Sequence, residues 1–253
     1  MTHLVLKDAV VVRDGVALLQ DANLDIRPGQ LTGLVGPNGA GKTTAVRALL
    51  GLQQLARGKA SIGGRCVTKL AAKDQALMVA YLPQARQLAW PVNVYEVVAL
   101  GRFAYGSGLG RLGQQDKTAI NDALAHCDLL HLAERSVANL SGGELARVHV
   151  ARAFATCAPA IVADEPTAAL DPKHAFGVLE LLRAKAKQGD AVLVILHDLA
   201  LAAQFCDKLI VMQEGRVVVQ GPPRDALSCE IIAKVFGVSA IWQEDRLSLI
   251  GNL

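Results

Sequence analysis

A glycine-rich segment near the N-terminus limits the folds that this chain can adopt more than any other feature. The segment reads Gly36-Pro37-Asn38-Gly39-Ala40-Gly41-Lys42-Thr43. The short apolar run Leu31–Val35 before it suits a buried strand of a parallel sheet. Thr43–Leu50 after it is helical in pattern and ends at Gly51, a residue type that commonly closes helices. A strand, a glycine loop and a helix in this order predict an α/β fold whose loop binds phosphate.

The residue types of this loop explain how it would hold a nucleotide. Glycines let the backbone curl so that several N–H groups point at phosphate oxygens, and the following helix adds the positive end of its dipole. The Lys42 ammonium would reach the β- and γ-phosphates, and the Thr43 hydroxyl would ligate Mg²⁺. The predicted phosphate-binding residues are Gly36, Pro37, Asn38, Gly39, Ala40, Gly41, Lys42, Thr43 and Thr44. Many nucleotide-binding proteins share this loop, so it does not say what nucleotide hydrolysis drives.

A second candidate site is a pair of acids at the end of a short apolar strand. Ile161–Ala163 leads directly to Asp164 and Glu165. Strand ends are where α/β sheets carry ligand chemistry, and successive side chains there point in different directions. Asp164 would therefore lie near Mg²⁺, while Glu165 would act as the general base that polarises the attacking water. A solvated turn is the alternative, but the apolar strand and the upstream phosphate loop favour catalysis.

The rest of the pattern predicts a β/α core that a helical region interrupts. The other strand candidates are Leu4–Val12, Val16–Ile26, Lys59–Val67, Ala76–Leu82, Ala191–Leu196, Lys208–Gln213 and, after a hairpin at Glu214-Gly215, Val217–Gln220. Helical patterns occur at Val94–Leu100, Gln114–Asp128, Gly142–Thr156, Pro172–Gln188, Leu199–Cys206 and Glu230–Phe236. No strand candidate interrupts the first three helices, and a glycine-rich loop covers 106–113. We therefore predict one domain over 1–253, with a core of 1–84 and 157–253 and a helical subdomain of 85–156.

Charge, cysteine usage and hydropathy argue against several kinds of function. The net charge is only +3 and no dense Lys/Arg run occurs, so nothing supports nucleic acid as a partner. The five cysteines are scattered without metal-ligand spacing, which is typical of reduced thiols that pack in a core. Apolar runs such as Ala76–Leu82 fall far short of the ~18 residues of a spanning helix, and no signal-peptide pattern occurs. We therefore expect a soluble chain that reaches a membrane only through a partner.

A third motif suggests a family. Leu140-Ser141-Gly142-Gly143-Glu144 opens a predicted helix, with Ser141 as the N-cap and two glycines that expose backbone donors. The order of phosphate loop, this motif and the acid pair resembles the ABC ATPase family. The resemblance runs from about Leu4 to Phe236. The remaining elements of the family also find matches, which are Gln84 after Tyr81-Leu82-Pro83, the D-loop Ala169-Leu170-Asp171, and His197.

The resemblance implies roles for these residues. Gln84 matches the glutamine that senses Mg²⁺ and connects to a permease, and His197 matches the histidine that contacts the γ-phosphate. The implied catalytic set is Glu165, His197 and Gln84, and the implied Mg²⁺ set is Thr43, Gln84 and Asp164. The D-loop residue Asp171 and the signature residues Ser141, Gly142 and Gly143 join the ATP-binding set.

The resemblance also implies an assembly and a fold. Two chains form a head-to-tail homodimer, or a dimer of ATPase subunits, that holds two ATP molecules. Each ATP lies between the phosphate loop of one chain and the Ser141–Gly143 segment of the other. The implied fold class is an α/β P-loop NTPase core with an N-terminal antiparallel β subdomain and an inserted α-helical subdomain.

Two departures from the family pattern occur. Many members have an aromatic residue near the N-terminus that stacks on adenine, but 10–14 contains none. Arg13 could take this place through its planar guanidinium. After the signature, Leu145-Ala146-Arg147 replaces a commoner Gln-Arg pair; Arg147 is retained, so we expect little consequence.

A narrower resemblance points to one group of importers. Three segments resemble importers of iron-siderophores, haem and cobalamin, which are Val94–Arg102, His197–Ala203 and Val235–Val238. The implied function is ATP-driven uptake of a metal chelate through a separate transmembrane permease, with a substrate-binding protein acting indirectly. The chain would then lie at the cytoplasmic face of the inner or plasma membrane as a peripheral subunit.

Other classes of ATPase remain as alternatives. A P-loop kinase or GTPase would share Gly36–Thr43 but would not need Ser141–Gly143 or His197. A non-transport ABC ATPase, such as an iron–sulfur assembly factor, shares every catalytic motif and differs by having a soluble scaffold as partner. Chromosome-organising ABC proteins carry long coiled coils, and no heptad tract lies between Gln84 and Leu140.

Overall fold

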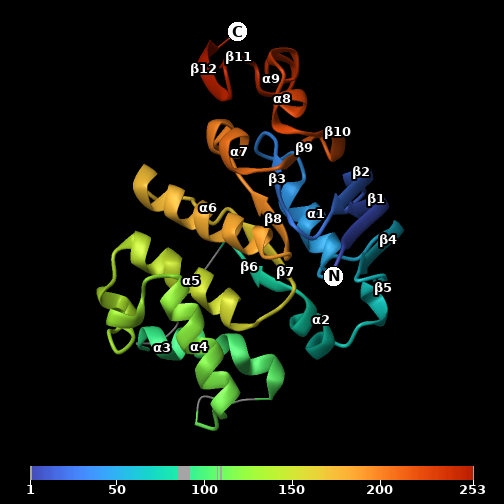
Figure 1. Cartoon of the computed structure of the whole chain (residues 1–253). Helices are drawn as coiled ribbons and strands as arrows, with labels where there is room; N and C mark the ends of the chain where they lie inside the picture. The colour runs from blue at the N-terminus through green and yellow to red at the C-terminus, as the bar shows by residue number, and fades with distance from the viewer. Residues whose placement is uncertain (1, 85–91, 107, 109, 253) are drawn as a thin grey trace.

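The centre of the computed structural model is a six-stranded sheet with the order β10-β9-β3-β8-β7-β6 (Figure 1). β10 pairs antiparallel with its neighbour, and the other pairs are parallel. The strands are β3 Gln30–Val35, β6 Ala80–Leu82, β7 Ala160–Asp164, β8 Ala191–Ile195, β9 Lys208–Gln213 and β10 Arg216–Gly221. Every residue of β7 and β8 is buried, which explains their continuous apolar sequences. The predicted α/β class is confirmed.

A smaller antiparallel sheet faces the central sheet across helix α1. Its strand order is β2-β1-β4-β5. The strands are β1 Leu4–Arg13, β2 Val16–Ile26, β4 Arg57–Ile62 and β5 Arg65–Cys66. Leu4 pairs with Ile26 of β2 and with Ile62 of β4, and all three side chains are buried in the same core. This core also contains one face of α1 (Lys42–Leu49), so the helix that follows the glycine loop is held from both sides.

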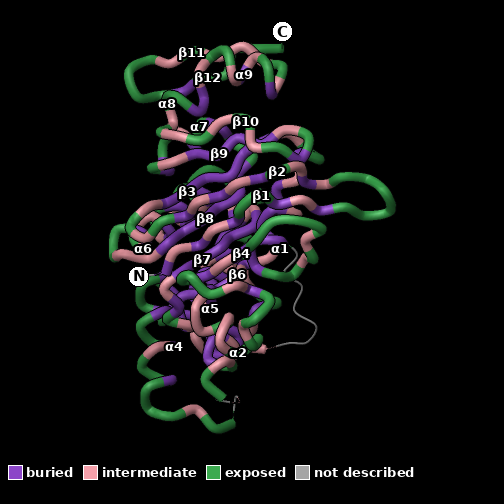
Figure 2. Tube along the Cα trace, turned by 90° about the vertical axis from the view of Figure 1, so that its right-hand side faces the viewer, coloured by how far each residue is buried: buried purple, intermediate pink, exposed green. Residues whose placement is uncertain are grey.

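Helices cover the opposite face of the central sheet. They are α3 Val94–Ala99, α4 Gln114–His126, α5 Gly142–Ala155, α6 Pro172–Lys187 and α7 Leu199–Phe205. The 3-10 turns are η1 Val67–Lys69, η2 Leu100–Tyr105, η3 Leu130–Leu132 and η4 Val137–Asn139. α3, α4 and α5 pack on one another below the sheet in Figure 1, and their buried side chains join the core that lines it. Figure 2 shows this burial along the strands, while much of α4 is exposed.

One predicted strand was correct only over its last three residues. The run 76–82 is divided between α2 (Ala72–Met78) and the three-residue strand β6. A short apolar run fits a buried strand or one face of a helix equally well, and periodicity alone does not separate them. α2 begins four residues before the apolar run, and Gln75 Nε2 bonds to Leu50 O. This tertiary contact supports a helix there.

The C-terminal segment combines the predicted helix at 230–236, which is α9, with a short helix and a hairpin that the sequence pattern did not indicate. α8 (Pro223–Ala226) and α9 (Cys229–Phe236) precede a hairpin of β11 (Val238–Gln243) and β12 (Arg246–Asn252). The Trp242 indole donates to Leu227 O at 2.8 Å, and Leu247 of β12 is buried in the main core. These two contacts attach the hairpin to the rest of the molecule at the top of Figure 1.

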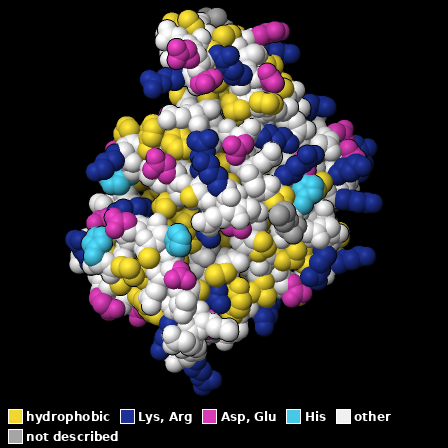
Figure 3. Space-filling model, in the orientation of Figure 1, with side chains coloured by type: hydrophobic (Ala, Val, Ile, Leu, Met, Phe, Trp, Pro, Cys, Tyr) yellow, Lys and Arg dark blue, Asp and Glu magenta, His cyan; other side chains and the backbone are white. Residues whose placement is uncertain are grey.

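The structure describes residues 2–84, 92–106, 108 and 110–252. The predicted start of the helical subdomain at 85 and two positions of the predicted glycine loop, 107 and 109, lie outside these residues. Within them, no helix combines the length and apolar character needed to cross a bilayer. Figure 3 shows Lys and Arg side chains gathered along the right-hand edge of the visible face, over the four-stranded sheet. The small net charge therefore conceals an uneven distribution.

Candidate functional site

The glycine loop follows the carboxyl end of β3 and curls over the start of α1. Gly36 has φ 156°, and a Cβ there would lie 2.2 Å from Met212 O of β9. Gly41 has φ 95°, and its Cβ would lie 2.9 Å from Leu18 O of β2. Both positions therefore exclude larger residues, because neighbouring backbone approaches too closely. The loop keeps backbone N–H groups and the N-terminus of α1 at one point, as an anion site requires.

Lys42 lies across the mouth of this loop. Its Nζ donates to Gly36 O at 2.8 Å and to Pro37 O at 2.9 Å. Burial lowers the pKa of Lys42, while the negative charges of Glu165 and Asp164 act in the opposite direction. An ammonium group carries three N–H donors, so Lys42 can bind an anion while keeping both loop contacts.

Asp164 ends β7 and is only 1% exposed. Its Oδ1 is buried and has no hydrogen-bond partner among the described residues, while Tyr81 donates to Oδ2 at 3.5 Å. Burial and the adjacent charge of Glu165 raise the pKa of Asp164. A bound cation would satisfy such an oxygen, and Mg²⁺ prefers hard oxygen ligands of this kind. The Thr43 hydroxyl, whose hydrogen bond acts to lower the pKa of Asp164, supplies a second oxygen, so the residues present fit Mg²⁺.

Glu165 connects the two other predicted catalytic residues. Its Oε2 accepts a hydrogen bond from Gln84 Nε2 at 2.6 Å, and its Oε1 accepts one from His197 Nε2 at 2.5 Å. Its backbone has φ 51°, a left-handed conformation that side chains rarely adopt and that recurs at functional sites. The three residues follow β6, β7 and β8, which are adjacent in the sheet. The carboxyl ends of these strands therefore bring them together.

A cavity of about 500 Å³ lies beside Glu165 and His197. It is lined by 38–44 of the loop together with Glu165 and His197. Its other walls were not predicted from the sequence, and they are Val16, Ala17, Leu18 and Gln20 of β2 and the hairpin residues Glu214 and Gly215. The cavity has the size of a small-ligand site, and a base could rest on its apolar wall.

The residues of the cavity wall bear on the suggestion that Arg13 stacks on adenine. Val16 is 61% exposed beside the cavity, whereas Arg13 is not part of the lining and lies 3.8 Å from Asp14. Gln20 ties the wall to the hairpin, because its Nε2 donates to Glu214 O at 3.2 Å. The only sign in the sequence that Val16 could contact the base was its position as an apolar residue directly after the Asp14-Gly15 turn. Arg13 as the stacking residue is not supported.

The signature segment lies outside this cavity. Ser141 caps α5 reciprocally with Glu144, since its N–H donates to Glu144 Oε2 at 2.7 Å and its Oγ accepts from Glu144 N at 3.3 Å. Ser141 and Gly142 are exposed at the helix start. None of 141–143 lines the cavity, so one chain does not bring the signature to its own phosphate loop.

Gly143 of the signature lies against the D-loop side of the same chain. A Cβ on Gly143 would meet the His174 ring at 2.1 Å, so the ring packs on its Cα. Asp171 caps α6, accepting from His174 N at 3.0 Å and pairing with His174 Nδ1 at 2.7 Å. The backbone bond from His174 and its ring lower the pKa of Asp171. His174 was not predicted, and nothing in the sequence pattern singled it out.

The fold and the site together define an α/β ATPase of the phosphate-loop class, with an acid pair on a strand end and a separate signature helix. A sequence profile described as ABC transporter matches residues 19–168, more than half of the chain. The chain therefore belongs to the ABC transporter family, and it is an ATP-hydrolysing subunit of that family.

Relatives and solved structures agree with this assignment. The hemin import ATP-binding protein HmuV of Pseudomonas entomophila (strain L48) is 41% identical over 236 residues, covering 91% of this chain and 91% of the relative. HmuV of Rhodococcus jostii (strain RHA1) is 41% identical over 227 residues, covering 90% of this chain and 77% of the relative.

Two solved structures share the fold. A metal-chelate type ABC transporter in an inward-facing conformation has a TM-score of 0.83 at 23% identity, covering 99% of this chain and 98% of that chain. A dimeric ATP-binding cassette bound to ADP and Pi has a TM-score of 0.76 at 27% identity, covering 87% of this chain and 99% of that one. The first likeness, at this identity, shows the fold alone. The predicted fold class is confirmed.

Proposed function

We propose that this chain is the motor of an importer that takes up a metal chelate of the haem class. The observation that carries the proposal is Glu165, which is hydrogen-bonded to both Gln84 and His197 beside the phosphate loop. This arrangement joins the proposed base Glu165 to His197, the proposed γ-phosphate contact, and to Gln84, which follows β6. The names of the HmuV relatives support haem as the cargo.

The proposed mechanism uses the glycine loop together with the residues that follow β6, β7 and β8. The loop 36–44 holds the phosphates through backbone N–H groups, Lys42 and the start of α1. Glu165 takes the proton of the attacking water, and His197 orients the γ-phosphate against it. Thr43, Gln84 and Asp164 would hold Mg²⁺, and the ion when bound would neutralise negative charge on the phosphates.

We further propose that the working unit is a head-to-tail dimer. The signature segment 141–143 begins α5 with exposed Ser141 and Gly142, and it does not line its own chain's cavity. A second chain can place this anion-binding helix start over the γ-phosphate. The dimeric cassette with bound ADP and Pi shows that proteins of this fold associate.

The permease is proposed to dock in a groove between α2 and η2. This docking groove has a volume of about 450 Å³ and is lined by Leu52, Ala76, Tyr81, Phe103 and Ala153 among others. Leu52 is 60% and Phe103 is 66% exposed, so the groove offers apolar surface to a helix from a partner. Tyr81 lies on β6, and Gln84 follows three residues later, which connects the groove to Glu165. Docking here would hold the chain peripherally at the cytoplasmic face of a membrane.

The proposal is tested by isolating the tagged chain from detergent-solubilised native membranes and measuring ATP turnover and haem uptake of the recovered complex in proteoliposomes. Recovery of a polytopic permease and ATP-dependent haem uptake support it. Glu165→Gln should retain ATP binding and lose turnover, with Glu180→Gln, an exposed change on α6, as the matched control. Recovery of only soluble scaffold proteins would instead support the assembly-factor alternative. Wild-type turnover in Glu165→Gln would show that Glu165 is not the base.

A further inference from the structure

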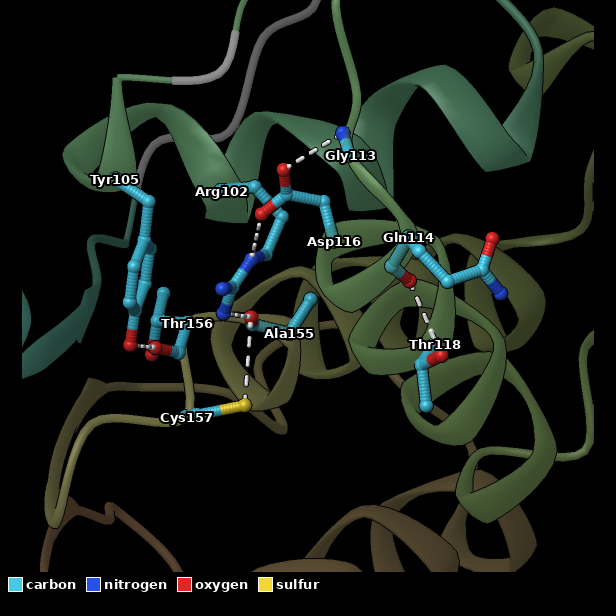
Figure 4. Close-up of polar contacts among 9 residues, drawn as sticks. All are labelled: Arg102, Tyr105, Gly113, Gln114, Asp116, Thr118, Ala155, Thr156 and Cys157. Atoms are coloured by element: carbon cyan, nitrogen blue, oxygen red, sulfur yellow. Dashed lines mark hydrogen bonds and ion pairs between the residues drawn. The ribbon is translucent and has the colours of Figure 1, made fainter.

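Arg102 is buried where η2, α4 and the C-terminal end of α5 meet (Figure 4). Its side chain is 6% exposed, and that of its partner Asp116 is 10% exposed. Its Nε donates to Asp116 Oδ1 at 2.9 Å, and its Nη1 donates to Ala155 O at 2.8 Å. A buried charge is costly unless its partners satisfy it, so the guanidinium has one stable position. Because Arg102 belongs to η2, these bonds determine where η2 lies.

Two further contacts attach η2 to the same helix end. A Cβ on Gly101 would lie 2.3 Å from Arg152 O, so this glycine permits the closest approach of η2 to α5. The Tyr105 hydroxyl donates to Thr156 O at 2.9 Å, and the Arg102 guanidinium carbon lies 3.6 Å from the centre of the Tyr105 ring. Figure 4 shows the Tyr105 ring and Asp116 on opposite sides of the guanidinium. η2 and the end of α5 therefore form one rigid unit.

This unit joins the two surfaces that the proposed function needs. Phe103, between the anchoring residues, lines the docking groove with Ala153 of α5. The other end of α5 carries the signature segment, about 20 Å away along a helix of 14 residues. A helix is stiff along its axis, and energetic coupling requires such contiguous packed elements. Movement of the signature would therefore displace the groove as well, provided that η2 stays fastened to α5.

We propose that Arg102 is a positioning residue that fastens the permease-docking segment to the signature helix and so couples ATP hydrolysis to the permease. The inference rests on the proposed function, because both surfaces need partners. Asp116 is the second residue of this anchoring ion pair. Gly113 N donates to its Oδ2 at 3.1 Å and holds the carboxylate in place. Loss of the pair should leave each surface intact and disconnect them from each other.

Three variants test this coupling. The double variant Arg102→Met with Asp116→Leu removes both charges together, so neither is left buried without its partner. Tyr105→Phe removes only the bond to Thr156 O and keeps the ring. Thr118→Ala is the matched control, because its exposed hydroxyl on α4 bonds only locally to Gln114 O. The measurement is kcat and KM for ATP, for the isolated chain and for the permease complex in nanodiscs.

We expect the permease to co-purify with all three variants. In the double variant, stimulation of ATP turnover by the permease should fall about fivefold or more, the lower end of coupling between linked sites. In Tyr105→Phe it should fall by about twofold, as for one hydrogen bond. KM for ATP and the rate of the isolated chain should stay unchanged, and Thr118→Ala should behave as wild type.

Full stimulation in the double variant would overturn the inference, and so would an equal loss of activity in the isolated chain, because that pattern indicates a general folding role. If the double variant does not fold, Tyr105→Phe decides by the same comparison. If the wild-type chain recovers no permease, the proposed function is wrong and this inference falls with it. If the wild type is stimulated and the variants are too, only the role of Arg102 is wrong.

Discussion

Replacing Gly143 with alanine should disturb the chain far more than the same change one residue earlier. A Cβ on Gly143 would lie 2.1 Å from Cδ2 and 2.3 Å from Cγ of His174, whereas a Cβ on Gly142 meets no heavy atom within 4 Å. The ring is tied in place, because its Nδ1 pairs with Asp171 Oδ2 at 2.7 Å. Gly143→Ala must therefore displace the ring or move α5 away from α6.

The contacts set the size of this effect. Overpacking costs about 1–3 kcal/mol and the lost hydrogen bond about 1 kcal/mol, so Gly143→Ala should lower the free energy of unfolding by about 2–4 kcal/mol. His174→Ala alone should cost about 1–2 kcal/mol at this partly exposed site. In the double variant the new methyl group occupies space that the ring has left, so the loss should stay near that of His174→Ala. The coupling energy of the cycle then equals the loss caused by Gly143→Ala alone, about 2–4 kcal/mol.

The assay is urea unfolding of the full chain followed by circular dichroism, with midpoints compared at constant slope. Gly142→Ala is the control and should change stability by less than about 1 kcal/mol. The same changes in a Glu165→Gln background should weaken ATP-dependent dimerisation for Gly143→Ala and partly restore it in the double variant. Additive losses within about 0.5 kcal/mol would refute the packing argument, as would equal effects at the two glycines.

Two further predictions concern Asp164 and the wall of the nucleotide cavity. Burial and the charge of Glu165 raise the pKa of Asp164 above 3.8, so its contribution to stability is present below pH 3.8 and is lost as pH rises through the folded-state pKa. Asp164→Asn should therefore raise the melting temperature at pH 7 in EDTA and flatten its pH dependence; a lower melting temperature would contradict the assigned cause. Val16→Ser should weaken ATP binding by roughly fivefold through lost apolar contact, and Arg13→Ala should leave it unchanged. Isothermal titration calorimetry measures both affinities, and the opposite order would show that Arg13 stacks on adenine.

Local patterns were sufficient where a short segment carries its own constraint. Glycines at 36 and 41 are needed because backbone from other strands approaches them, and the loop lies between a strand and a helix as the motif predicted. The strand before Asp164 was recognisable because both of its faces are buried, which leaves a continuous apolar run. The same reasoning did not assign the run 76–82 correctly, because a short apolar run suits a helix and a strand alike.

Contacts between distant segments could not be predicted from such patterns. Arg102 and Asp116 are ordinary charged residues in the sequence, and only the packing of η2 against α4 and α5 makes them a buried pair. Val16 lines the nucleotide cavity because β2 passes beside the loop. His174 packs on Gly143 because α5 and α6 start close together. In each case the partner is remote in sequence, so no local period or spacing reports it.

The sequence by itself determined the chemistry available to this protein: a phosphate loop, an acid pair on a strand end and a capped glycine helix start. The family resemblance added roles for Gln84 and His197 but no geometry. Only the tertiary structure decided that both residues bond to Glu165, because β6, β7 and β8 lie side by side although long segments separate them in the chain. Strand order depends on packing between whole elements, and the residues of one strand do not specify their neighbours.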